Sequence, residues 1–199
     1  MAVNKNKILK ITLFSFICSI PAWILVWRLF NDDLGANPVE FLEHSTGDWA
    51  IYFLLLTLSI SPIQKLFKPN WNRWLFAMPL VRRTLGLSAF CYALLHLSVY
   101  VYFEMGLSLR DTIQDIIERP FILIGMLAFI MLIPLAITST AGWQKRLKSR
   151  WKTLHKLVYP LTFLGILHYA LLVKADLMMP LIYLSLFMIL MAFRIKISR

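Results

Sequence analysis

Six long apolar runs, separated by short charged segments, constrain the fold of this chain more than any other feature of its sequence. A helix needs about 20 mostly apolar residues to cross the hydrocarbon of a bilayer. The runs cover residues 8–30, 49–66, 85–103, 121–139, 154–173 and 179–193. Hydrophobic residues make up 59% of the chain, whereas soluble domains contain about 45–50%. The sequence therefore predicts an all-α integral membrane protein, a six-transmembrane-helix bundle within the lipid bilayer.

The two sides of this predicted bundle differ in charge. One side, formed by both termini and by the second and fourth connections, carries all but four of the 21 lysines and arginines. The other side carries those four and all ten acidic residues. Because short basic segments stay in the cytoplasm, both termini are predicted to be cytoplasmic. This bias accounts for the net charge of +11, and no aromatic–basic motif indicates a nucleic-acid partner.

Three of the four histidines lie in or at the mouth of apolar runs, where a polar side chain is costly and suggests function. His96 follows Arg83 by about 20 Å of helix, and His168 follows Lys156 by about 18 Å. Both helices run outward, so we expect the two imidazoles at matching depth in the outer half of the bilayer. Such a pair can supply both axial ligands of a haem iron within a helical bundle. Taken singly, a buried histidine can instead hydrogen-bond a neighbouring helix.

His155 lies at the cytoplasmic mouth of the fifth run. On an ideal helix it points about 140° away from His168, so the two face the same way only if the helix deforms, for which Pro160 is a possible cause. A second haem at His155 would need a partner near Arg82, which is not a histidine. His155 therefore either finds another partner or serves a different ligand. The fourth histidine, His44, is predicted to be a solvated loop or cap residue.

No catalytic residue is predicted on this chain, because it lacks the common nucleotide-binding and nucleophile motifs. Zinc is disfavoured as well, since short-spaced ligand pairs are missing. Two other classes of function stay open. One is a proton or ion conductor that uses the histidines as a relay, which the lack of acidic residues within the runs disfavours. The other is a structural anchor in which haem only stabilises the fold.

Four stretches of the sequence carry a resemblance to a known family. They are NPVEFLEHSTGDWA, RRTLGLSAFCYALLH, LAITSTAGWQKRLKSRWKTLHKLVY and ILHY. With these motifs the chain resembles the MsrQ family, the haem-binding membrane subunits of the protein-methionine-sulfoxide reductase system. That family belongs to the ferric-reductase-like transmembrane proteins. The resemblance extends over about residues 37–193 and implies a single ferric-reductase-like domain over residues 1–199. It also implies b-type haem, with His96, His155 and His168 at the haem-associated positions.

The resemblance further implies electron transfer across the bacterial inner membrane. The electron donor would be the quinone pool or a cytosolic flavin reductase, and the acceptor a periplasmic molybdopterin-containing methionine-sulfoxide reductase. The catalytic site for sulfoxide reduction would lie on that partner. A chain that ends six residues after Phe193 is expected to lack the fused dehydrogenase domain of relatives that oxidise NADPH. The alternative function is a self-sufficient transmembrane ferric or cupric reductase.

The family is also described as binding FMN, and larger relatives carry four haem histidines. Here Arg82 or Arg83 occupies the inner position of the third run. Guanidinium groups bind phosphate well, so these arginines, near Lys152 and His155, are predicted to hold an FMN phosphate. Orientation alone also gathers arginines in cytoplasmic loops, and that explanation stays open.

The outward side contains one further predicted element. Residues 104–120 are predicted to form an interfacial helix, and together with residues 31–48 they form an acidic outer face. We expect this face to dock basic patches of a partner, with Asp111, Asp115 and Glu118 as contacts.

Overall fold

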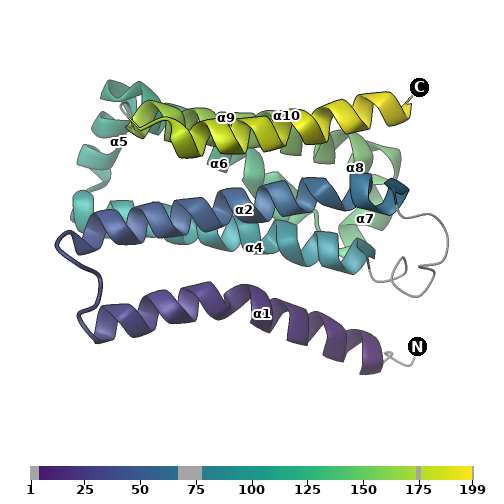
Figure 1. Ribbon diagram of the computed structural model, residues 1–199, viewed down its shortest axis with the longest axis horizontal. Helices are drawn as coiled ribbons and strands as arrows, with labels where there is room; N and C mark the ends of the chain where they lie inside the picture. Colours follow the sequence, from purple (N-terminus) through teal and green to yellow (C-terminus); the bar gives the residue numbers. More distant parts are fainter. Residues whose placement is uncertain (1–4, 67–77, 174–175, 199) are drawn as a thin grey trace. The chain divides into compact units, whose positions relative to one another are not determined.

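The computed structural model describes residues 5–66, 78–173 and 176–198. Within these ranges the chain is helical, with short connections and no strand (Figure 1). The helices form two compact units, Met1–Val99 and Tyr100–Arg199. The single domain over residues 1–199 stays a prediction. Four basic residues of the charge pattern lie outside the described residues: Lys68, Arg73, Lys174 and Arg199.

The described helices confirm the prediction of a multi-pass helical membrane protein. Five stretches are long and apolar enough to cross a membrane: Leu9–Phe30, Pro38–Gln64, Pro79–Glu104, Pro120–Ile137 and Ser149–Val173. A sixth apolar helical stretch, Met178–Arg194, is shorter than these five. It coincides with the sixth predicted run, but the number of spans and the orientation of the termini stay predictions.

The first unit is built around an antiparallel pair of helices. Its elements are α1 (Lys5–Phe30), α2 (Pro38–Leu66) and α4 (Met78–Val99). α2 packs along α4, and α1 packs mainly against α4. His96 of α4 meets Glu43 near the start of α2, whereas Arg82 of α4 meets Ser61 near its end. These two contacts fix the opposite directions of α2 and α4.

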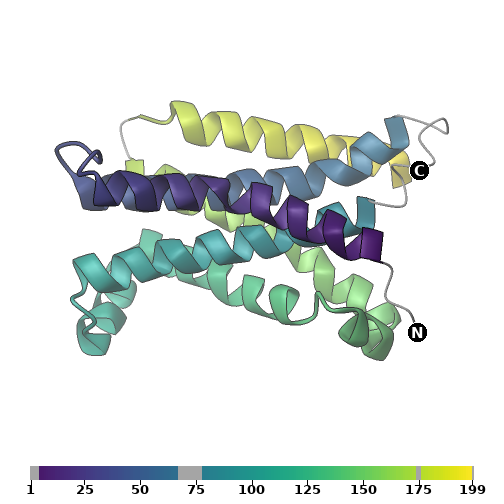
Figure 2. The same cartoon turned by 90° about the horizontal axis from the view of Figure 1, so that it is seen from below.

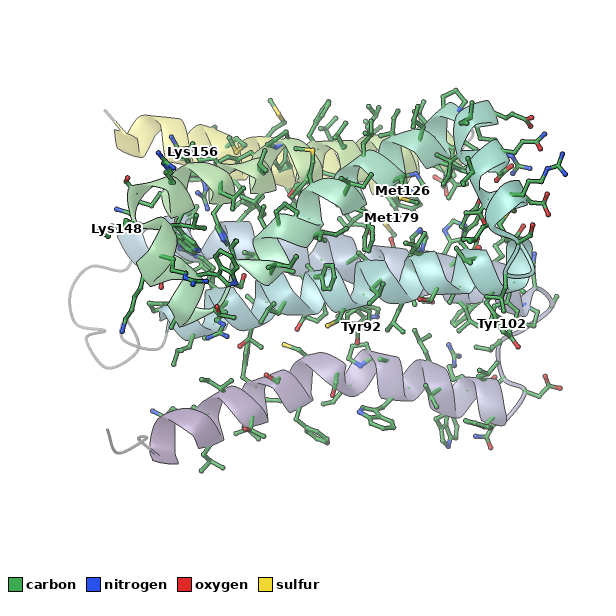
Figure 3. The ribbon with its side chains drawn as sticks, turned by 180° about the vertical axis from the view of Figure 1, so that it is seen from behind. Tyr92, Tyr102, Met126, Lys148, Lys156 and Met179 are labelled. Atoms are coloured by element: carbon green, nitrogen blue, oxygen red, sulfur yellow. The ribbon has the colours of Figure 1, made fainter. Side chains whose placement is uncertain are left out.

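α1 bends near its middle, where Pro21 interrupts the helix (Figure 1). Proline has no N–H and its ring displaces the carbonyl one turn earlier. The Tyr92 hydroxyl enters the helix one step beyond this point: Ala22 N donates to it over 2.8 Å, and it donates to the Cys18 carbonyl over 3.1 Å. Figure 3 shows Tyr92 on the side of α4 that faces α1. One side chain thus replaces a direct backbone hydrogen bond and fastens α1 to α4.

α2 begins earlier than predicted, at Pro38 rather than at residue 49. The cause is a cap at Asn37, whose side-chain oxygen accepts from Glu40 N over 3.4 Å while its amide donates to the Glu40 carboxylate over 2.8 Å. Pro38 at the first helical position and an acid in the first turn add to this start signal. The prediction that His44 is a loop or cap residue is therefore wrong, because His44 lies inside α2 and is half-buried.

The second unit is also built around an antiparallel pair. Its elements are η1 (Tyr100–Glu104), α5 (Leu109–Glu118), α6 (Pro120–Ile137), α7 (Ala141–Leu147), α8 (Ser149–Leu154), η2 (His155–Leu157), α9 (Val158–Val173) and α10 (Met178–Ser198). α6 packs along α9, and α10 packs on α9. His168 meets Phe121 at the start of α6, and His155 meets Thr138 at its end. α5 adjoins one end of α6, and α7 and α8 adjoin the other (Figure 2).

The predicted outer helix exists as α5. Its cap is Ser108, whose side chain accepts from Asp111 N. Leu109, Ile113 and Ile117 form an exposed apolar stripe along it. A short polar helix with such a stripe, joined directly to membrane-spanning helices, suits the interface between lipid and water.

The fifth predicted run is not one regular helix. A 3-10 turn, His155–Leu157, separates α8 from α9, and Pro160 follows it within the first turn of α9. Because proline cannot continue the hydrogen-bond ladder of a preceding α-helix, the tighter turn just before it is expected. The helix therefore deforms between His155 and His168, at the position where Pro160 was considered as a possible cause.

Candidate functional site

His96 lies on α4 with its ring against the backbone of α2. Its Nδ1 is 3.0 Å from the Glu43 carbonyl oxygen and 3.5 Å from the Thr46 hydroxyl oxygen. A carbonyl oxygen only accepts hydrogen bonds, so Nδ1 carries the proton at this contact. The imidazole is then in the tautomer that places its lone pair on Nε2, the atom a metal would use. A ring atom of His96 also lies 3.3 Å from where a Cβ on Gly47 would be.

His168 lies on α9 and has the same arrangement against α6. Its Nδ1 is 2.6 Å from the Phe121 carbonyl oxygen. The same tautomer follows, with the lone pair on Nε2. The Phe121 ring stacks on the imidazole, with centroids 6.0 Å apart and planes 29° apart. A Cβ on Gly125 would lie only 2.8 Å from Nδ1 of His168.

The two histidines therefore share one local geometry, although they belong to different units. In each, Nδ1 is fixed on a carbonyl of the antiparallel neighbour, and a glycine one turn further along that neighbour makes room for the ring. A hydrogen bond from the second ring nitrogen to a backbone carbonyl is the usual way in which proteins orient a metal-ligating histidine. The pairing of His96 with His168 on one iron stays a prediction.

His155 has a different arrangement. Its Nε2 is 3.1 Å from the Thr138 hydroxyl oxygen, which itself donates to the Pro134 carbonyl over 2.6 Å. Because the single hydroxyl proton is used there, Nε2 of His155 acts as the donor, and the lone pair lies on Nδ1. The Trp151 ring stacks on His155 at 4.0 Å between centroids, and its Nε1 donates to the Thr138 carbonyl over 3.0 Å.

His155 and His168 contact opposite ends of α6. Thr138 and Phe121 are separated by about 25 Å of helix at 1.5 Å per residue, so the structure does not bring these two histidines together. His155 forms instead a compact cluster with Trp151 and Thr138, which fastens α8 and the 3-10 turn to the end of α6.

The two arginines differ in their surroundings. Arg82 is half-buried, and its Nη2 donates to the Ser61 hydroxyl of α2 over 2.7 Å. Arg83 is exposed. Arg82 and Arg83 belong to the first unit and His155 to the second, so a shared phosphate site for FMN stays a prediction. Within the first unit, Arg82 has a structural contact, and Arg83 is the more accessible of the two.

Sequence reasoning missed the residues that orient the histidines. These are Gly47 and Gly125, the carbonyls of Glu43 and Phe121, and Thr138. A glycine inside a helical run is the one signal that was present, because it costs helix stability and commonly has a packing reason. The carbonyls carry no sequence signal at all.

The fold and these contacts together define a class: a multi-pass helical membrane protein with histidines fixed between antiparallel helices in a ligand-type tautomer. Comparison with known families matches residues 46–166 to the ferric reductase like transmembrane component. The match includes His96 and His155 and ends two residues before His168.

Three relatives carry the name protein-methionine-sulfoxide reductase heme-binding subunit MsrQ. The protein of Herminiimonas arsenicoxydans is 46% identical over 165 residues, which is 80% of this chain and 73% of the relative. The protein of Caulobacter vibrioides is 43% identical over 180 residues, which is 89% of this chain and 82% of the relative. The protein of Xanthomonas euvesicatoria pv. vesicatoria is 41% identical over 170 residues, which is 85% of this chain and 75% of the relative. The chain belongs to the MsrQ family, as its motifs predicted.

Proposed function

We propose that this chain binds b-type haem through His96 and His168 and carries electrons across the bacterial inner membrane. The observation that carries the proposal is the shared geometry of the two histidines: each has Nδ1 on a backbone carbonyl and its lone pair on Nε2. The pairing itself comes from their matching depth in the sequence. The names of the relatives support haem as the group that is bound.

The residues present fit a haem iron better than another metal. Two neutral imidazoles suit a six-coordinate iron that needs only two protein ligands, and among the described residues no three His, Cys, Asp or Glu side chains gather into a metal site. Gly47 and Gly125 provide the room that each ring occupies. When bound, the haem would supply a one-electron centre whose potential depends on its axial ligands and pocket. The chain holds the rings in one orientation, and its apolar helices exclude water.

His155 has a supporting role in this proposal. Its Nε2 is committed to Thr138, so it does not present the ligand atom that His96 and His168 present. We expect one haem per chain for that reason. We further propose that Arg83, with Arg82 beside it, contributes to an FMN phosphate site at the cytoplasmic edge.

The proposed partners lie on both sides of the membrane. Electrons would come from the quinone pool or from a cytosolic flavin reductase. The electron acceptor would be a periplasmic molybdopterin-containing methionine-sulfoxide reductase. The relatives' names support a link to the methionine-sulfoxide reductase system; the molybdopterin and the periplasmic location are part of the proposal. On the outer side, Asp111 and Glu118 of α5 are exposed and suit contact with a basic patch. We leave Asp115 out of the proposed surface because its side chain is only 13% exposed; it accepts from Tyr100 over 2.7 Å and bonds Arg119 over 2.8 Å.

The decisive experiment is an optical spectrum of purified protein made with ample haem supply, with haem and flavin quantified per chain. We expect a low-spin haem spectrum that His96→Ala and His168→Ala abolish. His155→Ala should retain it, as should the control His44→Ala, which replaces a half-buried histidine of α2 outside the proposed site. An unchanged spectrum in both His96→Ala and His168→Ala would refute the assignment of the ligands.

The acceptor is tested with the reduced protein. Rapid reoxidation by the purified reductase partner, with slow reoxidation by ferric or cupric chelates, is expected for an electron-transfer subunit. Efficient reduction of the chelates without any partner would favour the self-sufficient metal reductase instead. Haem that the partner never reoxidises would indicate a structural anchor.

A further inference from the structure

We infer that Gly47 and Gly125 are positioning residues for the two histidine ligands. The inference rests on the proposed function, since it concerns how His96 and His168 are held for a haem iron. In each unit the missing side chain of the glycine lets an imidazole lie against the neighbouring helix. The contact brings Nδ1 onto the carbonyl one turn earlier in that helix, at Glu43 or Phe121.

Gly125 has the tighter contact. A Cβ there would lie 2.8 Å from Nδ1, 2.9 Å from Cε1 and 3.1 Å from Cγ of His168. Two of these distances are shorter than real Cβ atoms show, so the ring would have to move. It cannot move without lengthening the 2.6 Å bond from Nδ1 to the Phe121 carbonyl or breaking its stacking on the Phe121 ring. The substitution Gly125→Ala would therefore turn the imidazole.

Gly47 makes the same contact more loosely. A Cβ there would lie 3.3 Å from Cε1, 3.3 Å from Nδ1 and 3.9 Å from Cγ of His96. The bond from Nδ1 to the Glu43 carbonyl is also longer, at 3.0 Å. A shift of a few tenths of an ångström would relieve Gly47→Ala, so its effect should be weaker than that of Gly125→Ala.

Two other helical glycines show that the contact with a histidine ring is not a general feature of glycines in these helices. Gly86 on α4 and Gly165 on α9 lie on the helices that carry the two histidines, and no atom would meet a Cβ at either within 4 Å. Glycine inside a helix costs about 0.5–1 kcal/mol relative to alanine. At Gly86 and Gly165, alanine should therefore be tolerated or stabilising. At Gly47 and Gly125 this gain in helix stability is opposed, because a methyl group would fill the space that each imidazole occupies.

The consequence for the ligand is specific. The carbonyl that accepts from Nδ1–H fixes the plane of the ring and raises the basicity of Nε2. Turning the ring weakens the hydrogen bond from Nδ1–H and changes the direction in which Nε2 points. Ligand orientation and hydrogen bonding both tune a haem, so the low-spin electron paramagnetic resonance spectrum and the midpoint potential should respond.

The test compares Gly125→Ala with Gly165→Ala, and Gly47→Ala with Gly86→Ala, in protein purified with its haem. Loss of an outer contact to a metal ligand commonly lowers affinity about 10-fold to 100-fold, and we expect a loss of that order for Gly125→Ala. Gly47→Ala should keep its haem but show a displaced largest g value and a shifted midpoint potential. Both controls should match the wild type in all three measurements.

A double variant separates positioning from misfolding. In a His168→Ala background the ring is gone, so adding Gly125→Ala should leave helicity and the unfolding temperature unchanged or raise them slightly, because alanine favours the helix over glycine. If it lowers them further, Gly125 acts on the fold and the inference is wrong. It is also overturned if haem-loaded Gly125→Ala matches Gly165→Ala in content, spectrum and potential. Wild-type protein that binds no haem would instead refute the proposed function.

Discussion

Beside the bend of α1 at Pro21, one hydroxyl group joins this helix to α4, and we expect Tyr92→Phe to loosen α1 from α4. The hydroxyl makes two hydrogen bonds to the α1 backbone, at Ala22 and Cys18. Hydrogen bonds between membrane helices contribute about 0.6 kcal/mol on average and up to about 1.7 kcal/mol. The two bonds together should therefore contribute about 1–3 kcal/mol to the packing of α1. The ring itself stays, and with it the contact to Phe53 of α2 at 5.3 Å between centroids.

Cys18 offers a direct assay for this loosening. Its side chain is only 6% exposed, whereas Cys91 is exposed and can be replaced by alanine. In that background the rate of maleimide labelling of Cys18 reports how often α1 opens from α4, when opening is fast relative to labelling. A free-energy difference of about 1.4 kcal/mol changes the equilibrium constant of opening tenfold, so Tyr92→Phe should raise the labelling rate about 5-fold to about 150-fold.

The matched control is Tyr102→Phe, which removes a hydroxyl from a ring that is 59% exposed. It should leave the labelling rate of Cys18 unchanged. The haem spectrum should also survive Tyr92→Phe, because the ring and His96 one turn later stay in place. Labelling of Cys18 at the wild-type rate in Tyr92→Phe would refute the role of the hydroxyl.

Three further predictions concern the second unit. Thr138→Val removes the acceptor of His155, so thermal unfolding should show a loss of about 1–3 kcal/mol while the haem absorbance stays; an unchanged unfolding temperature would contradict the contact. Asp115→Asn weakens the bonds that hold α5, and amide hydrogen exchange over this helix should accelerate relative to Asp111→Asn. Asp111→Lys combined with Glu118→Lys should slow electron delivery to the reductase at low salt and matter little at high salt. Equal rates at low salt would exclude this surface from docking.

The positions of most helices were predictable because membrane spans are recognised from apolar length alone. The runs at residues 8–30 and 121–139 agree closely with α1 and α6. α2 was predicted to start too late, because its first turns contain Glu40, Glu43 and Asp48 and do not look like a span. The cap at Asn37 and the contact with His96 maintain that polar beginning as helix.

The histidines were predictable as candidates, but their geometry was not. A costly polar residue in an apolar run is visible in the sequence. Which carbonyl accepts from Nδ1, and which glycine makes room for the ring, depends on the register between two helices far apart in the chain. Local patterns carry no information on that register, so Gly47 and Gly125 gained a role only from the packing of α2 on α4 and of α6 on α9.

The internal similarity of the two antiparallel pairs bears on the number of haems. Near the start of α2 and of α6, each pair has a histidine on a carbonyl with a glycine one turn on. Near the ends of α2 and α6, the equivalent contacts differ: Arg82 donates to Ser61 in one pair, and His155 donates to Thr138 in the other. One pair thus has a guanidinium at this position, and the other has a histidine whose Nε2 is engaged with Thr138. Only His96 and His168 keep the same geometry within their own pairs, and for this reason the proposal of a single haem uses these two histidines and leaves His155 out.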